Sequence, residues 1–218
     1  MPVRARQKQK RRRRRRARRL EGTAQSVFLN IPYDAAFENL LLAYIAAISA
    51  FGFTPRATLE IPFNRRLDRI LSLIEQSEYS IHDLSRVQLD RAIPCTPRFN
   101  MPFELGLTVA LKSAKVPNHA WVVCETMRRR INKSLSDLDG TDPYIHGGTI
   151  QGVFREMCNV FVRGRRNPTV ADMMEIYRTL RSELKNILRQ AGADSPFNAR
   201  VFQDLCTVAS AAANRLVG

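Results

Sequence analysis

Short apolar runs alternate with stretches of helical periodicity along most of this chain. Residues 26–31 (Ser-Val-Phe-Leu-Asn-Ile) form a run typical of a buried parallel strand, and apolar residues from Phe37 to Ile48 then recur at helical spacing. The alternation predicts strands over residues 26–31, 53–61, 79–85, 119–125 and 144–145. It predicts helices over residues 35–51, 64–77, 100–113 and 149–161. We therefore expect an α/β fold with a mostly parallel five-stranded sheet flanked by helices.

Beyond residue 168 the pattern is purely helical. Residues 170–190 and 199–217 each carry one apolar stripe, and Gly192 and Pro196 separate them. This predicts a C-terminal helical hairpin that packs either on the sheet domain or on a second subunit, which would make a homo-oligomer. The expected organisation is a tail over residues 1–22, an α/β domain over 23–163 and the hairpin over 164–218.

The positive charge of the chain is concentrated in its first twenty residues. The formal net charge is +15, and residues 1–20 hold twelve Lys or Arg and no acid. Without those twelve, 23 basic residues face 20 acidic ones, a net charge of only +3. A run of like charges repels itself and buries no apolar surface, so we expect residues 1–22 to be disordered.

Three interpretations of this tail stay open. It could bind nucleic acid without sequence preference, through counterion release. It could tether the protein to another acidic surface, or it could be an upstream extension from a misplaced start codon. No aromatic residue interleaves the arginines, so the tail offers no platform for base stacking.

Several classes of protein are disfavoured by the composition. No apolar segment suits a signal peptide or a membrane span, and the four cysteines form no C-x-x-C pair. Scattered cysteines without a secretion signal favour a cytoplasmic location. The three histidines show no ligand spacing, so no metal site is expected, and both the dinucleotide-binding G-x-G-x-x-G and the P-loop motif are absent.

Polar side chains follow two of the predicted strands at the point where each strand ends. Asn30, Tyr33 and Asp34 lie at the end of the first strand, and Asp83 and Ser85 end the third. Glu104 lies near the start of the next helix, where we expect Asn100 to cap it. In an open parallel sheet, ligands bind outside the carboxyl ends of the strands. The candidate site residues at this edge are therefore Asn30, Tyr33, Asp34, Asp83, Ser85, Arg98 and Glu104.

Each candidate also has a purely structural interpretation. Asn30 and Asp34 could serve as helix caps, and Glu104 could do no more than complement the helix dipole in the first turn. Arg66 and Arg69 share a helical face, and any of these or Arg98 could meet a phosphate, although a solvated face is the commoner outcome.

Three segments resemble a pair of related families. Residues 28–34 (Phe-Leu-Asn-Ile-Pro-Tyr-Asp), 80–85 (Ser-Ile-His-Asp-Leu-Ser) and 99–106 (Phe-Asn-Met-Pro-Phe-Glu-Leu-Gly) look like TIR-like domains and nucleoside 2-deoxyribosyltransferases. The resemblance implies a flavodoxin-like sheet and makes Glu104 the counterpart of the catalytic glutamate. It implies that Asn30, Tyr33 and Asp34 face the nucleotide or nucleoside, and that Asp83 is the polar residue ending the third strand.

Taken together, these features predict an enzyme that cleaves or transfers an N-glycosidic bond of a nucleotide or nucleoside. Glu104 would stabilise or trap the ribosyl cation. NAD is one candidate substrate, and no separate cofactor is expected. The rival interpretation is a non-catalytic module that senses a nucleotide in the same crevice and relays assembly through the helical hairpin.

Overall fold

A computed structural model describes residues 26–60, 66–87, 89–90, 93, 96–114, 118–138, 140–162 and 164–217. The arginine-rich tail predicted over residues 1–22 lies outside the described residues.

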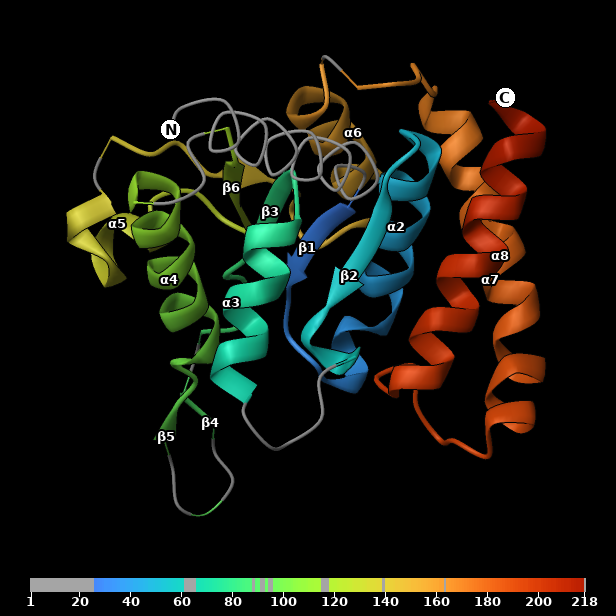
Figure 1. The fold of residues 1–218 in the computed structure, drawn as a ribbon, viewed down its shortest axis with the longest axis horizontal. Coiled ribbons are helices and arrows are strands. Elements are labelled where there is room, and N and C mark those ends of the chain that lie inside the picture. Colours follow the sequence, from blue (N-terminus) through green and yellow to red (C-terminus); the bar gives the residue numbers. More distant parts are fainter. Residues whose placement is uncertain are drawn as a thin grey trace, which may run out of the picture.

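Five parallel strands form the central sheet (Figure 1). They are β1 (Ser26–Asn30), β2 (Thr54–Ala57), β3 (Tyr79–Asp83), β6 (Ala120–Glu125) and β7 (Tyr144–Ile145). Their order across the sheet is β2-β1-β3-β6-β7, and every neighbouring pair runs parallel. This is the flavodoxin-like arrangement, so the predicted fold class is confirmed. The strand order reverses between β1 and β3, which is where ligands bind in sheets of this kind.

Helices cover both faces of the sheet. The helices α2 (Glu38–Ala50) and α6 (Ile150–Val160) lie on one face, and α3 (Arg66–Gln76) and α4 (Asn100–Ala114) on the other. Successive side chains of β1 show this division: Phe28 packs with the α3 and α4 side chains, whereas Leu29 belongs to the core around α2. Such a strand is buried on both faces, which explains its continuous apolar run.

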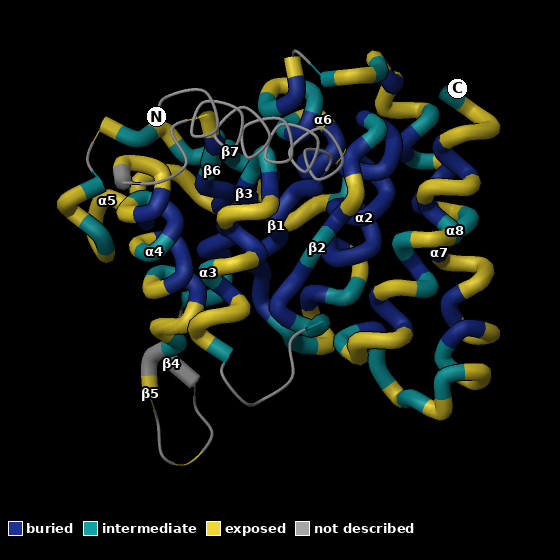
Figure 2. Tube along the Cα trace, viewed as in Figure 1, coloured by how far each residue is buried: buried dark blue, intermediate teal, exposed yellow. Residues whose placement is uncertain are grey.

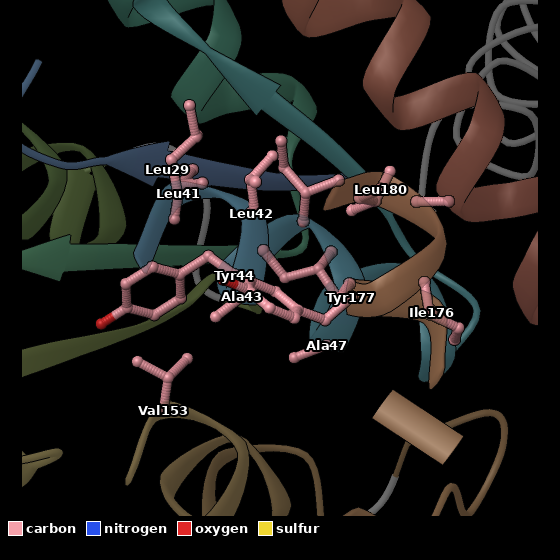
Figure 3. Packing of buried hydrophobic residues seen from close by; sticks show 14 of the residues in the cluster. Leu29, Leu41, Leu42, Ala43, Tyr44, Ala47, Val153, Ile176, Tyr177 and Leu180 are labelled. Carbon is pink, nitrogen blue, oxygen red and sulfur yellow. The ribbon is translucent and has the colours of Figure 1, made fainter. Parts of the chain in front are cut away.

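The C-terminal hairpin packs on α2. Its two helices, α7 (Val170–Ala191) and α8 (Ala199–Leu216), lie side by side next to α2 at one end of the molecule (Figure 1). Buried positions of both helices face inward and exposed positions face outward (Figure 2). Side chains of α2 such as Leu42 and Ala47 lie in one cluster with Ile176 and Leu180 of α7 (Figure 3). The hairpin therefore packs on the sheet domain.

Two strands end two or more residues before their predicted ends, and in both cases a side chain accepts a backbone hydrogen bond near the strand end. The second strand was expected to continue to residue 61, but β2 ends at Ala57. There the Glu60 carboxylate accepts a hydrogen bond from the Ala57 N–H at 3.0 Å, and the 3₁₀-helix η2 (Thr58–Glu60) follows. The strand β3 ends at Asp83 because its carboxylate accepts from the Ser85 N–H at 2.9 Å.

Several small elements were not foreseen. The connector between β3 and α4 contains an antiparallel pair, β4 (Leu89–Asp90) and β5 (Thr96–Pro97). A short helix, α5 (Arg130–Ser134), and the 3₁₀-helix η3 (Ser136–Leu138) follow β6. The first helical segment begins as the 3₁₀-helix η1 (Ala35–Phe37), and the Asp34 side chain forms no capping hydrogen bond to it.

Candidate functional site

A cavity opens at the carboxyl edge of the sheet, where the strand order reverses between β1 and β3. Its volume is about 310 Å³, at the lower end of the range for small-molecule sites. Residues from the end of β1, from η2 and from the N-terminal parts of α3 and α4 form its walls. The lining residues are Asn30, Ile31, Pro32, Tyr33, Thr58, Arg66, Arg98, Asn100, Met101 and Glu104.

Glu104 is the buried carboxylate of this cavity. It is only 6% exposed, and its Oε2 atom has no hydrogen-bond partner among the described residues. Burial raises the pKa of Glu104 from its ordinary value of 4.5 to about 7, and the positive charge of Arg66 opposes this shift. At neutral pH the side chain therefore exists both as a carboxylate and as a carboxylic acid.

The expected position of Glu104 in the first helical turn is wrong. The helix α4 begins at Asn100 itself, the Phe103 N–H bonds to the Phe99 carbonyl, and the first turn contains no acidic residue. Glu104 is the fifth residue of the helix, where the dipole effect has largely faded. Its protonation is instead governed by desolvation, which acts in the opposite direction.

Asn30 holds the end of β1 against the start of α4. Its Nδ2 atom donates to the Met101 carbonyl at 3.0 Å and contacts the His82 Nδ1 atom at 2.8 Å. Because the Met101 carbonyl can only accept, Nδ2 is the atom that faces it, and His82 Nδ1 then accepts the second hydrogen. This leaves the Asn30 Oδ1 atom as the acceptor that the side chain can offer to a ligand.

His82 supports this contact from within the sheet. It is fully buried, and burial, reinforced by the nearby His119, lowers the pKa of His82 to about 3, so the ring is neutral. With Nδ1 accepting from Asn30, the proton sits on Nε2, which has no hydrogen-bond partner among the described residues. We assign His82 a supporting position behind the cavity wall.

Tyr33 forms another wall and is held from two sides. Its hydroxyl lies 2.8 Å from the Thr58 hydroxyl in η2, and its ring packs against Phe197 in the α7–α8 connection, with ring centroids 5.8 Å apart. Burial raises the pKa of the Tyr33 phenol well above its ordinary value, so the hydroxyl stays protonated. Phe197 thus connects the C-terminal hairpin to the cavity.

Asp34 lies beside the cavity between two guanidinium groups. Its Oδ2 atom is 3.2 Å from Arg98 Nη1 and 3.4 Å from Arg86 Nε. The lining residues include Arg98 but not Asp34, so this candidate orients an arginine and does not itself form the wall. Its pairing with two arginines also explains why Asp34 does not cap the following helix.

Asp83 and Ser85 do not lie in the cavity with Glu104, contrary to the expectation that all three share one crevice. Both are buried, and the Asp83 Oδ2 atom is 2.8 Å from the Tyr44 hydroxyl and 3.1 Å from His146 Nε2. Its Oδ1 atom accepts from the Ser85 N–H and hydroxyl. These four residues, the Asp83 cluster, join α2, β3 and the loop after β7.

The Asp83 cluster has the residue types of a catalytic triad but not the geometry. Ser85 Oγ lies 3.3 Å from His146 Nε2, the same nitrogen that contacts Asp83, whereas a triad uses opposite nitrogens of the ring. The other nitrogen, Nδ1, accepts from the Gly148 N–H at 3.1 Å, which puts the proton on Nε2. His146 is therefore a donor to Asp83, and the cluster is a satisfied structural network.

Two kinds of feature are absent from the described residues. No group of three or more His, Cys, Asp and Glu side chains there is arranged to hold a metal ion. No helix in the described part is long and apolar enough to cross a membrane.

Comparison with known proteins adds no neighbour. No protein-family model, no curated protein and no solved structure matches this chain. The family resemblance inferred from the three sequence segments stays a prediction.

The cavity brings together four of the candidate residues: Asn30, Tyr33, Arg98 and Glu104. The cavity also includes Thr58, which no sequence pattern indicates as a site residue. It includes Arg66, which the sequence indicates only as one of several arginines that could meet a phosphate. Both lie close to an element boundary, Thr58 at the end of β2 and Arg66 at the start of α3. The carboxyl-end rule could have selected Thr58 if the end of β2 had been placed correctly.

Proposed function

We propose that this protein cleaves or transfers the N-glycosidic bond of a nucleotide or nucleoside, with Glu104 as the reacting carboxylate. The observation that supports this best is that Glu104, which lines the cavity at the strand-order reversal, has a buried Oε2 atom without a hydrogen-bond partner among the described residues. A buried carboxylate without a partner is costly to the fold, and such groups concentrate at functional sites.

The chemistry follows from the ionised form of Glu104, which is present at neutral pH because the pKa is about 7. As the C1′–N bond breaks, its electron pair leaves with the base, and positive charge develops on the sugar ring. The ionised carboxylate stabilises this charge or bonds to C1′; water, or a ring nitrogen of an acceptor base, then bonds to C1′, releases the carboxylate and loses its proton to solvent. The departing base takes up a proton from solvent, because one carboxylate cannot be the ionised group and the acid in the same step.

The neighbouring side chains suit a sugar in the same cavity. Asn30 offers the Oδ1 atom as an acceptor for a sugar hydroxyl, since both Nδ2 hydrogens are directed at protein atoms. Tyr33, which keeps its phenolic proton, lies close enough for the charge of Glu104 to affect its pKa. Both residues would orient the sugar relative to Glu104.

The test is release of free base by the purified full-length chain. We would incubate it with nucleosides, deoxynucleosides, their monophosphates and NAD, and separate the products by chromatography. Glu104→Gln keeps the size but removes the charge, so release should fall on the order of a hundredfold or more. Glu183→Gln, the same change at an exposed position of α7, should release base at the wild-type rate.

The two outcomes that oppose the proposal are distinct. A Glu104→Gln variant as active as wild type would remove Glu104 from the mechanism. Wild-type protein that binds a nucleotide but releases no base would instead favour the sensing module. One contact is consistent with that alternative: the ring packing of Tyr33 against Phe197 joins the cavity to the helical hairpin.

A further inference from the structure

Two guanidinium groups reach the same cavity as Glu104 from different elements. Arg66 is the first residue of α3, and Arg98 precedes α4. Arginine presents a planar fork of donors that matches the oxygens of a phosphate. The two residues are brought together by the fold, since the rest of α3 and the strands β3, β4 and β5 separate them along the chain.

The arginines near the cavity differ in the ion pairs that they form with described residues. Asp34 offers one carboxylate to two guanidinium groups, those of Arg86 and Arg98. No ion pair joins Arg66 to a carboxylate of the described residues, although the charge of Arg66 affects the pKa of both Tyr33 and Glu104. Arg66 thus lies within electrostatic reach of the proposed reacting group.

The size of the cavity limits what it can enclose. At about 310 Å³ it lies at the bottom of the range for small-molecule sites. It suits one nucleotide unit better than both halves of a dinucleotide.

We propose that the ligand of this cavity is a nucleoside monophosphate, whose phosphate is bound by Arg66 with Arg98 as a second contact while its sugar faces Glu104. This inference rests on the proposed function for the identity of the sugar and base. It narrows the substrate class from nucleotides and nucleosides in general to phosphorylated mononucleotides.

The experiment measures binding separately from turnover. Titration calorimetry on the full-length Glu104→Gln variant, which should not consume the ligand, would compare a nucleoside 5′-monophosphate with the unphosphorylated nucleoside. A charge-assisted contact predicts that the monophosphate binds about ten- to a hundredfold more tightly. Adding Arg66→Gln should remove most of that preference, and Arg66→Lys should restore part of it.

Arg69→Gln provides the matched control. Arg69 lies on the same helix α3, is exposed and does not line the cavity, so its loss should leave the preference intact. The arginine-rich residues 1–20 could bind phosphate on their own, and every variant keeps them. A preference that is lost in Arg66→Gln but kept in Arg69→Gln therefore comes from the cavity and not from residues 1–20.

The outcomes distinguish this inference from the proposed function. Equal affinity for nucleoside and monophosphate, or an Arg69→Gln variant as impaired as Arg66→Gln, would overturn the phosphate assignment even if the wild type releases base. A clear phosphate preference that depends on Arg66, without base release by the wild type, would support the phosphate site and refute the catalytic proposal. No binding of either compound would refute both.

Discussion

Asp83 and Glu104 are both buried carboxylates near the carboxyl edge of the sheet, yet their surroundings differ in one decisive respect. Asp83 is fully buried and receives hydrogen bonds from Tyr44, Ser85 and His146. Glu104 is 6% exposed, and one of its carboxylate oxygens has no partner among the described residues.

This difference separates a structural acid from a candidate catalytic one. A buried carboxylate whose oxygens are all satisfied ties elements together, and removing it leaves its donors unpaired. A buried carboxylate that faces a cavity without a partner costs stability and remains available to a ligand. Burial alone does not distinguish the two, and neither does position in the sequence.

The largest expected effect is the loss of stability in Asp83→Ala. The change removes the acceptor of four buried donors: the Tyr44 hydroxyl, the Ser85 N–H, the Ser85 hydroxyl and His146 Nε2. At about 1–3 kcal/mol for each unsatisfied group, the free energy of unfolding should fall by about 4 kcal/mol or more. Urea denaturation measures this value.

Asp204→Ala, on the outer side of α8, is the control for Asp83→Ala. Asp204 makes only a 4.0 Å contact with Arg200, so its loss should change stability by less than about 0.5 kcal/mol. If Asp83→Ala lost less than about 1 kcal/mol, the Asp83 cluster would not be the structural network described above.

Glu104→Gln should change stability in the opposite direction, by a smaller amount that depends on pH. The pKa of Glu104 rises from 4.5 to about 7 on folding, so the folded protein holds this proton more tightly than the unfolded chain. The resulting stabilisation is complete below pH 4.5 and is lost as the pH rises through 7. Relative to the non-titrating glutamine, the wild type should be less stable at pH 8 by up to about 3 kcal/mol.

Urea denaturation of both proteins at pH 5 and pH 8 measures this difference. The advantage of the glutamine variant should be fully present at pH 8 and reduced to about a quarter of that value at pH 5. A variant that is less stable than the wild type at pH 8 would show that Glu104 has a stabilising partner, which would make it similar to Asp83.

Much of the fold could be predicted because its signals are local. The period of the apolar residues located α7 and α8 to within a residue or two, and the short run at Tyr144–Ile145 located β7. The end of β2 was missed because the Glu60 carboxylate accepts the hydrogen bond of the Ala57 N–H. The period of the apolar residues carries no sign of such a side-chain contact. The small β4–β5 pair was missed because two-residue strands have no detectable period.

The site was harder to predict because the hydrogen-bond partners of a buried polar group come from residues far away in the sequence. The rule that ligands bind at the carboxyl ends of parallel strands correctly predicted that Asn30, Tyr33 and Glu104 share one cavity. It could not separate Asp83 from them, since the partners that satisfy Asp83 come from α2 and from the loop after β7. Nor could it foresee that desolvation, and not the helix dipole, governs the protonation of Glu104.

The most direct test of the central claim is an NMR titration of the Glu104 side-chain carboxyl carbon. Its resonance would be assigned in protein labelled at the glutamate carboxyl carbon, as the signal that disappears in Glu104→Gln. Desolvation in the cavity predicts a titration midpoint near pH 7. A midpoint at or below the ordinary value of 4.5 would mean that the carboxylate is hydrated or paired, and would contradict the claim that it is a buried acid available to a ligand.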